Sequence, residues 1–403
     1  MPSADRPLTR LTGNQARIAQ TLRVLGPSTR AELINATGLS RATVSAVVGE
    51  LTASGLVIEP GGTAPAGPSG GRPAAVVQLD RSAGLVVGVD VGRSHLRIAV
   101  ADLAHTIVAE AAERTVPGEE SDAAAVLERA AAAIERLLLS CGHTLGDVIG
   151  VGFGLPAPVV NPAGQIGSPN IFPGWAGLTP THELGARLGV PVCVENDANL
   201  GALSESLWGA GRGHQAVVYV KLGTGIGAGI VFDGQLFRGV TGTAGEIGHL
   251  SLDTNGDICR CGNRGCLELV ASGAALVTAL HPTRPDVTDL TDLVRLAIDD
   301  DAACRRLLAD AGGHVGVALG GIVNLINPDR VLIGGELGRA GALLLDPLTA
   351  SLQRSAVPAA VAALSVGPGI LGERAEVLGA LALVLREPER LVSPETPDIQ
   401  AAG

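Results

Sequence analysis

The sequence predicts an α/β protein in two parts: a small head of helices and short strands, followed by a large body of buried strands, glycine-rich turns and helices. Short segments of helical periodicity lie between Gln15 and Ser54, whereas apolar runs of strand length, punctuated by glycine, begin after Asp80. The 403 residues include 56 Gly and only 2% aromatic residues, so the core must be built from Val, Leu, Ile and Ala. A chain of this length requires two or three structural units.

The first two helices of the head are delimited by clear start and stop signals. Apolar residues recur on one face of the segment Gln15–Leu25, and Gly26-Pro27 ends it. Thr29 followed by Glu32 is a capping box, which predicts the start of a second short helix.

A third helix is predicted to begin after Ser40, which can cap it, and to end near Ser54-Gly55. Helices of this length around a Gly-containing turn are typical of a helix-turn-helix, whose third helix enters the major groove of DNA. The candidate base-contacting residues at its start are Arg41, Thr43 and Ser45. The alternative is a three-helix packing or dimerisation module.

Two short strands, Leu56–Ile58 and Ala75–Val77, follow the helices and enclose the loop Gly61–Pro73. This arrangement predicts a wing, with Arg72 at its tip able to enter a minor groove. The alternative for the loop alone is a linker that carries Arg72 by chance.

Charge is distributed unevenly along the chain, which has a net charge of -11. A mildly basic head on an acidic body is expected if only the head touches DNA phosphates. Residues 1–79 contain seven Arg and four acids: Arg6, Arg10, Arg17, Arg23, Arg30, Arg41 and Arg72 against Asp5, Glu32, Glu50 and Glu59.

The body begins with a predicted hairpin of strands Leu85–Val91 and Leu96–Ala101, similar to the start of an actin-like ATPase lobe. Its turn contains Asp90 and Gly92, a candidate first phosphate loop. An amphipathic helix over Ala123–Leu139 and a buried strand over Val148–Gly152 follow.

A second lobe is predicted to begin near Pro191 and to contain the strands Val217–Leu222 and Ile230–Phe232. The glycine-rich hairpin between them lets backbone N–H groups approach a phosphate closely, although a tight turn alone also requires glycine. Its candidate phosphate-binding residues are Gly223, Thr224, Gly225 and Gly227.

The segment Glu195–Asn199 places amide and carboxylate side chains at a predicted strand end, where a ligand cleft belongs. Asp197 is a candidate general base that removes a proton from a sugar hydroxyl. The alternative is a helix cap rich in Asn and Asp.

The most specific feature of the chain is a cluster of three thiols and one imidazole. This ligand set completes a tetrahedral zinc shell without an open position, so we expect a structural Zn²⁺. The loop that the metal fixes also holds Glu246 and Glu268 as acceptors for sugar hydroxyls. The alternative is a set of unliganded buried thiols. The predicted ligands are His249, Cys259, Cys261 and Cys266.

These motifs together closely resemble the ROK family of repressors, open reading frames and sugar kinases, over roughly residues 85–385. With the winged head, the chain resembles the repressor branch of the family, which includes xylose and N-acetylglucosamine repressors. The resemblance implies a two-lobed actin-like ATPase (sugar kinase-like) body with zinc on the four ligands above. It also implies these sugar contacts: Asn170, Asn196, Asp197, Glu246, His249 and Glu268.

The chain departs from the kinases of the family in the first phosphate loop, where they carry Asp-x-Gly-Gly-Thr-Lys. Here Arg93 replaces the second Gly and adds a bulky side chain where the backbone should close on phosphate. We therefore expect a regulator without kinase activity, and Asp197 would be catalytic only in a kinase.

Two functions follow from these expectations. The first is a sugar-responsive DNA-binding repressor of carbohydrate genes, acting in the cytoplasm as a homodimer or homotetramer on operator DNA. The alternative is a sugar kinase that phosphorylates a monosaccharide with ATP. No membrane segment is expected.

The expected domains are a DNA-binding head, two lobes and a tail. The head is expected over 1–80, the first lobe over 81–190 with a C-terminal helix at about 372–386, the second lobe over 191–371, and a disordered tail over 387–403.

Overall fold

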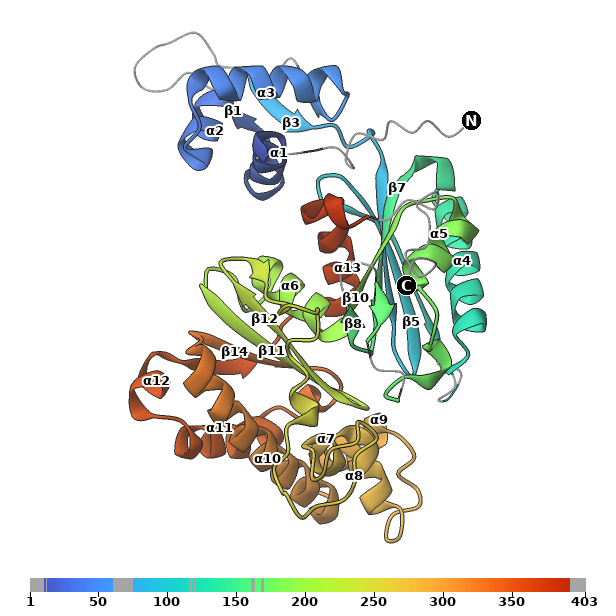
Figure 1. Cartoon of the computed structure of the whole chain (residues 1–403), viewed down its shortest axis with the longest axis vertical. Coiled ribbons are helices and arrows are strands. Elements are labelled where there is room, and N and C mark those ends of the chain that lie inside the picture. Colours follow the sequence, from blue (N-terminus) through green and yellow to red (C-terminus); the bar gives the residue numbers. More distant parts are fainter. Residues whose placement is uncertain are drawn as a thin grey trace.

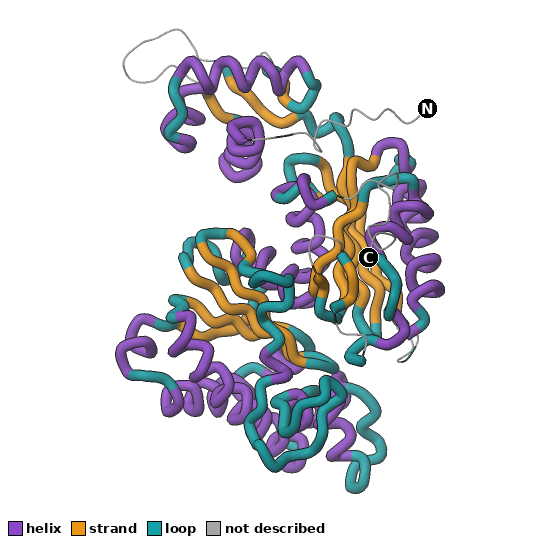
Figure 2. Tube along the Cα trace, in the orientation of Figure 1, coloured by secondary structure: helices purple, strands orange, loops and turns teal. Residues whose placement is uncertain are grey.

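The computed structural model describes residues 11, 13–60, 75–115, 118, 121–160, 164–167 and 170–391. It places a small head beside a body of two α/β lobes (Figure 1). Figure 2 shows a separate β-sheet in each lobe, and helices flank both sheets. The predicted fold class is confirmed.

The head has the predicted helices and both predicted caps. Thr29 and Glu32 form the capping box, and the Ser40 side chain accepts a hydrogen bond from the backbone N–H of Thr43. The helices are α1 (Gly13–Leu25), α2 (Arg30–Thr37) and α3 (Arg41–Ala53).

A three-stranded sheet completes the head in the order β1-β3-β2. The predicted strands are present as β2 (Val57–Ile58) and β3 (Val76–Leu79), which pair antiparallel. The sequence analysis missed β1 (Ser28–Thr29), which pairs with β3, because two residues are too short to show a period. The predicted wing loop Gly61–Pro73, with Arg72, lies outside the described residues apart from its flanking strands.

The first lobe is built on a sheet in the order β10-β7-β4-β5-β6. β4, β5 and β6 are antiparallel neighbours. On the other side of β4, β7 pairs with it in parallel, and β10 pairs in parallel with β7. The strands are β4 (Leu85–Val91), β5 (His95–Asp102), β6 (Ile107–Arg114), β7 (Val148–Leu155) and β10 (Val192–Asn196), and the short pair β8 (Val159–Val160) and β9 (Gln165–Ile166) lies apart.

The second lobe repeats this plan in the order β13-β12-β11-β14-β15. Again an antiparallel meander is extended by two parallel strands. The strands are β11 (Ala216–Leu222), β12 (Ile226–Phe232), β13 (Gln235–Leu236), β14 (Arg330–Gly334) and β15 (Ser365–Pro368).

The expected division of the lobes near Pro191 is too early. β10 pairs with β7 of the first sheet from Val192 to Asn196, so the first lobe continues through Asn196. Apolarity alone could not assign this strand, because strands of both lobes have the same buried pattern.

The body helices cover the sheets and lie between them. They are α4 (Ala123–Ser140), α5 (Pro180–Leu188), α6 (Asp197–Trp208), α7 (Glu268–Ala271), α8 (Gly273–Leu280), α9 (Leu290–Ile298), α10 (Ala302–Ile326), α11 (Ala342–Ser355), α12 (Pro358–Ala363) and α13 (Ala375–Arg386).

α6 and α13 pack against each other between the two sheets, as Figure 1 shows. Gly379 of α13 lies so close to the backbone of Leu200 on α6 that a Cβ atom there would be 2.0 Å from the Leu200 oxygen. Only glycine fits this crossing, which brings the two helices into direct backbone contact.

The head packs directly on the body through Arg23 of α1. Its guanidinium donates hydrogen bonds to the Leu103 carbonyl, 3.2 Å away, and to the Leu385 carbonyl near the end of α13, 2.7 Å away. The cores of the head and of the α6–α13 layer form one continuous apolar cluster. The head therefore contacts the helix that runs between the lobes.

The C-terminal segment differs from the predicted tail at its start. Pro388–Arg390 form a 3₁₀ turn, and Arg390 pairs with the buried Glu195. The ordered chain therefore continues beyond Glu387, where the disordered tail was predicted to begin. Residues 392–403 lie outside the described part of the chain.

Within the described ranges, α10 is the one helix long and apolar enough to cross a membrane by length and composition. Of its most apolar stretch, 44% is buried, and its inner face packs on α11 in the core of the second lobe. This is the pattern of a core helix.

Candidate functional site

A cleft between the lobes collects most of the predicted site residues. Five of the six side chains predicted to contact sugar line it, together with residues of both glycine loops. The predicted residues that line it are Gly92, Asn196, Asp197, Gly223, Thr224, Gly225, Gly227, Glu246, His249 and Glu268.

Asp197, the candidate general base, lies at the first turn of α6 and is engaged through both carboxylate oxygens. Its Oδ1 accepts the N–H of Ala198 at 2.8 Å. Its Oδ2 accepts from the ammonium of Lys221 on β11, also at 2.8 Å. Both oxygens of the candidate base are therefore already engaged by groups of the protein.

Lys221 lies among three carboxylates at the base of the cleft. Besides Asp197, its Nζ lies 3.4 Å from Glu376 of α13, and Asp90 is close enough to interact with its charge. Although burial alone would lower it, these three negative charges raise the pKa of Lys221. The ammonium is therefore a permanent internal cation at this position.

The first phosphate loop is filled by a side chain of its own hairpin. His95 Nε2 lies 2.8 Å from Asp90 Oδ2, and the His95 ring lies over Gly92, where a Cβ atom would be 2.2 Å from the ring. Burial alone would raise the pKa of Asp90, but the charges of Lys221 and His95 lower it to about 2. The loop that would receive phosphate is thus occupied by an imidazole.

Glu336 adds a negative charge to the second glycine loop. A Cβ atom on Gly223 would lie 3.0 Å from its carboxylate. Ser94, from the first lobe, donates a long hydrogen bond of 3.5 Å to Glu336 across the cleft. A carboxylate at this place repels phosphate.

Two further carboxylates, Glu246 and Glu268, line the cleft. Burial and the charges of Asp197 and Glu268 raise the pKa of Glu246 to about 7. Glu268 accepts from Arg260 at 2.6 Å, and its other oxygen accepts from the N–H of Ile226 at 3.4 Å. Both side chains can accept hydrogen bonds from hydroxyl groups of a ligand.

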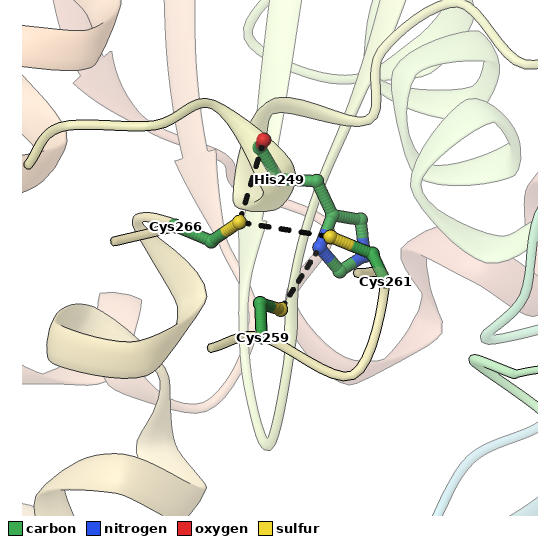
Figure 3. Close-up of side chains that lie close together, drawn as sticks. All are labelled: His249, Cys259, Cys261 and Cys266. Carbon is green, nitrogen blue, oxygen red and sulfur yellow. Dashed lines mark hydrogen bonds between the residues drawn. The ribbon is translucent and has the colours of Figure 1, made fainter. Parts of the chain in front are cut away.

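The four predicted metal ligands converge beside the cleft (Figure 3). Their ligand atoms all lie within 4.8 Å of one another, with Cys261 Sγ 3.7 Å from Cys266 Sγ and Cys259 Sγ 3.6 Å from His249 Nδ1. Tetrahedral zinc with Zn–S of about 2.3 Å and Zn–N of about 2.0–2.1 Å separates its ligands by roughly 3.5–3.8 Å. The donor set and its spacing therefore fit a metal ion of this kind.

Asn196 serves chiefly as the N-cap of α6. Its Oδ1 accepts from the N–H groups of Ala198 and Asn199, and its Nδ2 donates to the Ala157 carbonyl at 3.1 Å. The helix-cap alternative is thus correct for Asn196, which nevertheless lines the cleft.

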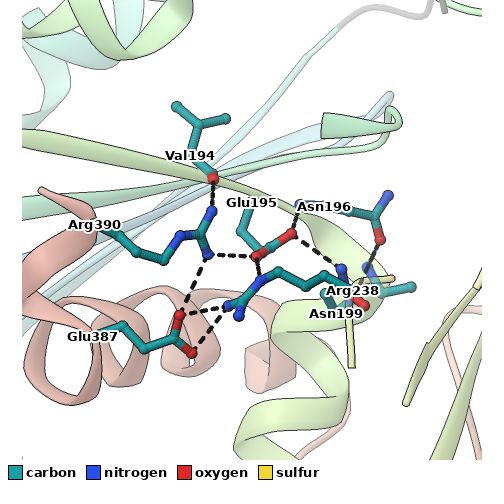
Figure 4. A network of polar contacts seen from close by, with 8 residues as sticks. Val194, Glu195, Asn196, Asn199, Arg238, Glu387 and Arg390 are labelled. Carbon is teal, nitrogen blue, oxygen red and sulfur yellow. Dashed lines mark hydrogen bonds and ion pairs between the residues drawn. The ribbon is translucent and has the colours of Figure 1, made fainter. Parts of the chain in front are cut away.

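Glu195, beside it, is fully buried in an ion network that joins the lobes to the C-terminal turn (Figure 4). Its Oε2 lies 2.6 Å from both Arg238 and Arg390, and Glu387 pairs with Arg238 at 2.8 Å. Burial alone would raise the pKa of Glu195, but the charges of Arg390 and Arg238 lower it. The network holds the turn after α13 against β10.

Apart from the three cysteines of the candidate metal site, two predicted residues of the body do not line the cleft. Asn170 is exposed, although its neighbour Ile171 lines the cleft, and Asp90 is buried beneath it. In the head, Arg41 and Ser45 are exposed, whereas Thr43 is half-buried and its hydroxyl lies 2.9 Å from that of Ser40. Thr43 therefore belongs partly to the cap of α3.

The sequence analysis missed Lys221, His95, Arg260 and Glu336. All four line the cleft. A lysine within the apolar strand that leads into the glycine loop was the available signal for Lys221, because a charge is rarely buried without a partner.

The fold and cleft define a class: a winged helix-turn-helix head joined to a two-lobed body of the sugar kinase type. The sequence matches the ROK family over residues 86–387 and the MarR family over residues 11–63. Since the first match covers most of the chain, the protein belongs to the ROK family.

Similar proteins include repressors and kinases. The xylose repressor of Bacillus subtilis (strain 168) is 30% identical over 372 residues, which cover 92% of this chain and 94% of that protein. The crystal structure of a ROK family transcriptional regulator, a homolog of the Escherichia coli Mlc protein, covers 94% of this chain and 97% of its own, with a TM-score of 0.78 and 27% identity. A ROK family glucokinase from Streptomyces griseus, in complex with glucose and AMPPNP, covers 74% of this chain and 99% of its own, with a TM-score of 0.64 and 30% identity.

Proposed function

We propose that this protein is a sugar-responsive transcriptional repressor, in which a monosaccharide bound between the lobes controls how the head binds operator DNA. The observation that carries the proposal is the direct contact of a helix-turn-helix head with α13, a helix whose Glu376 also pairs with Lys221 in the lining of the cleft. A ligand that favours one arrangement of the lobes thereby biases the head.

The start of α3 is the DNA-reading element of this proposal. Arg41 and Ser45 are exposed at its first turns, while Val44 and Val47 of the same helix are buried in the head core. Arginine at this place can donate two hydrogen bonds to a guanine edge in the major groove. Arg72 would add a contact from the wing.

Hydroxyl recognition by the cleft rests on carboxylates and one imidazole. Glu246, Glu268 and Asp197 supply acceptor oxygens, and His249 contributes the ring nitrogen that does not face Cys259. Asn196 lines the cleft beside Asp197 and can contribute a polar contact to the sugar. Asn170, next to the cleft-lining Ile171, would contact the sugar if its side chain turned toward the cleft.

Zn²⁺ is the metal that the four ligands would hold, in a structural role. Three thiolates and one imidazole leave no position for substrate. Bound zinc would fix the segment that carries Glu246 and Glu268, and so the acceptors that face the sugar.

Phosphoryl transfer is not part of the proposed function. Lys221 occupies the accepting oxygen of Asp197, His95 fills the first phosphate loop, and Glu336 places a negative charge by the second. The first engages the candidate general base, the second occupies the turn that would bind phosphate, and the third repels a phosphate group. All three therefore oppose phosphoryl transfer from a nucleotide.

In this proposal the protein acts in the cytoplasm as a homodimer or homotetramer. Its twofold symmetry would then be matched by a symmetric operator. A twofold pair of heads places two α3 helices on half-sites about 34–36 Å apart, or a multiple of that distance.

The test measures fluorescence anisotropy of a labelled fragment of the upstream region of the protein's own gene, with xylose, glucose and N-acetylglucosamine as candidate effectors. One sugar should change the operator affinity by about 5- to 150-fold. Arg41→Ala should weaken operator binding by about 1–3 kcal/mol without altering sugar affinity. Arg306→Ala, the same charge change on exposed α10, is the matched control.

Clear phosphorylation of any of these sugars by ATP would contradict a purely regulatory role. Equal operator affinity of the Arg41→Ala and Arg306→Ala variants would remove Arg41 from the DNA contacts.

A further inference from the structure

The chain contains 29 Lys and Arg residues together, and Lys221 is the only lysine among them. Its ammonium lies between α6 and α13. Asp197 Oδ2 on α6 is 2.8 Å from Nζ, and Glu376 Oε1 on α13 is 3.4 Å from it. Both carboxylates are buried. One ammonium is therefore shared by two helices.

A lysine behaves differently from an arginine at this position. A guanidinium is a rigid planar fork that holds a carboxylate through two bonds, whereas an ammonium is a compact charge with three rotating donors on a flexible stem. The third nearby carboxylate, Asp90, is already engaged by His95, whose Nε2 is 2.8 Å away. A small movement of the ammonium can therefore change its main partner from Asp197 to Glu376.

Of the two carboxylates that share the ammonium, Asp197 is the one that lines the cleft. Glu376 is outside the lining, and its Oε1 accepts a further hydrogen bond from the Tyr219 hydroxyl at 3.2 Å. A sugar hydroxyl that donates to Asp197 competes with the ammonium for the lone pairs of this carboxylate. Such a ligand favours the arrangement in which the ammonium lies closer to Glu376.

α13 connects Glu376 with the head. Glu376 is in the first turn of this helix, and the carbonyl of Leu385 near its other end accepts from Arg23 of α1 at 2.7 Å. α13 crosses α6 at Gly379 in direct backbone contact, and small sliding of packed helices is a common form of conformational change. A displacement of α13 at Glu376 therefore reaches the carbonyl that binds the head.

On the basis of the proposed repressor function, we propose that Lys221 is the positioning residue that transmits sugar binding to the head. In the sugar-free protein the ammonium is bonded to Asp197 of α6. When a sugar hydroxyl occupies Asp197, the ammonium moves toward Glu376 and holds α13 instead. The sugar binds this second state more tightly, so it shifts the population toward the corresponding position of the head.

The first test measures the ratio of operator affinities without and with saturating xylose, glucose or N-acetylglucosamine. In the wild-type protein one sugar should give a ratio of about 5- to 150-fold. Glu376→Gln keeps an acceptor for Tyr219 but removes the charge that attracts the ammonium, and the ratio should fall close to one. Lys221→Arg replaces the movable ammonium by a fork and should have the same effect. Glu135→Gln on exposed α4 is the matched control and should keep the wild-type ratio.

The second test uses the single lysine as a probe. In protein labelled with ¹⁵N-lysine, the ammonium resonance belongs to Lys221, and the same sugar should shift it. Arg23→Met interrupts the contact between α13 and the head, so it should keep this shift but lose the change in operator affinity. Arg17→Met, on the same helix and exposed, is its control and should keep both.

An unchanged affinity ratio in Glu376→Gln, or in Lys221→Arg if the first variant does not fold, would overturn the proposal. A purely structural ion pair would change the melting temperature of these variants but not the ratio. An ammonium resonance that saturating sugar leaves in place would also overturn it. If no sugar alters operator affinity in the wild-type protein, the repressor function itself fails, so the two failures are distinguishable.

Discussion

Lys221 is the residue that most changes the chemistry expected of the cleft. Its ammonium lies within hydrogen-bond distance of Asp197 and near Glu376 and Asp90, all four being largely removed from water. Three buried carboxylates without a cation would repel one another strongly, and a nucleotide-binding site would need a metal ion to compensate them. In this protein the ammonium group of Lys221 compensates the three carboxylates instead of a metal ion.

A double-mutant cycle tests this ion pair. Lys221→Met should lower the free energy of unfolding by about 3–5 kcal/mol, because it leaves Asp197 buried without its partner. Asp197→Asn in the Lys221→Met background should recover part of the loss. Urea unfolding of the four proteins gives the coupling energy, and strictly additive effects would show that the two side chains do not interact.

His105 should make stability depend on pH. Its pKa in the folded chain is lowered to about 3 by burial and by the charges of Arg23 and Arg386, against 6.5 when unperturbed. The unfolded chain therefore takes up a proton that the folded chain refuses, and stability falls as pH falls from 6.5 toward 3. Between pH 7 and pH 5 this amounts to about 2 kcal/mol.

His105→Asn should make this dependence shallower by about the same amount, since Asn tolerates the left-handed backbone and does not titrate. Urea unfolding of both proteins at pH 7 and pH 5 measures the difference. If both proteins lost the same free energy of unfolding between pH 7 and pH 5, the pKa of His105 would not be lowered in the folded chain.

At the scale of elements, the metal loop, residues 250–266, has little regular secondary structure. Between Leu250 and Cys266 the described chain contains turns and isolated bridges but no helix or strand of its own. Backbone hydrogen bonds, such as those from Leu252 to Gly265 and from Cys259 to Asn263, hold the loop, and metal binding by the four candidate ligands can contribute further to its folding.

Removal of one ligand tests the metal loop. Cys261→Ser should reduce bound zinc from one ion per chain to a small fraction, lower the melting temperature and abolish the sugar response. Cys141→Ser is the matched control, because Cys141 lies at the end of α4, far from the cluster in sequence. Metal analysis by mass spectrometry and thermal unfolding check both, and full zinc retention by Cys261→Ser would exclude Cys261 as a ligand.

The whole molecule is tied together at its centre by the network around Glu195. Glu195 of the first lobe, Arg238 of the second and Arg390 after α13 share buried charges. Removing one partner from such a group leaves an uncompensated buried charge, which costs several kcal/mol.

Two truncations isolate this contribution. Ending the chain after Leu391 keeps Glu387 and Arg390 and should leave stability nearly unchanged. Ending it after Arg386 removes both and should lower the free energy of unfolding by about 3 kcal/mol or more. Urea unfolding compares them, and equal stability of the two truncated proteins would show that the network does not anchor the C-terminal segment.

The sequence alone determined the features that depend on near neighbours. The capping box at Thr29, the cap at Ser40 and the glycine-rich hairpin before Ile226 are local, because each depends on residues a few positions apart. The clustering of the candidate ligands Cys259, Cys261 and Cys266 was predictable for the same reason, since a tetrahedral shell restricts the spacing of its ligands.

Only the tertiary structure decided which distant groups share a site. Lys221 meets Glu376, Arg23 bonds a carbonyl 362 positions away, and Arg390 reaches Glu195 across 195 positions. No periodicity or spacing links such residues, because the fold and not the chain brings their charges together. The sequence thus determined the head, the lobes and the metal loop, whereas the packing of α6 and α13 between two sheets decided that the candidate base has an internal cation.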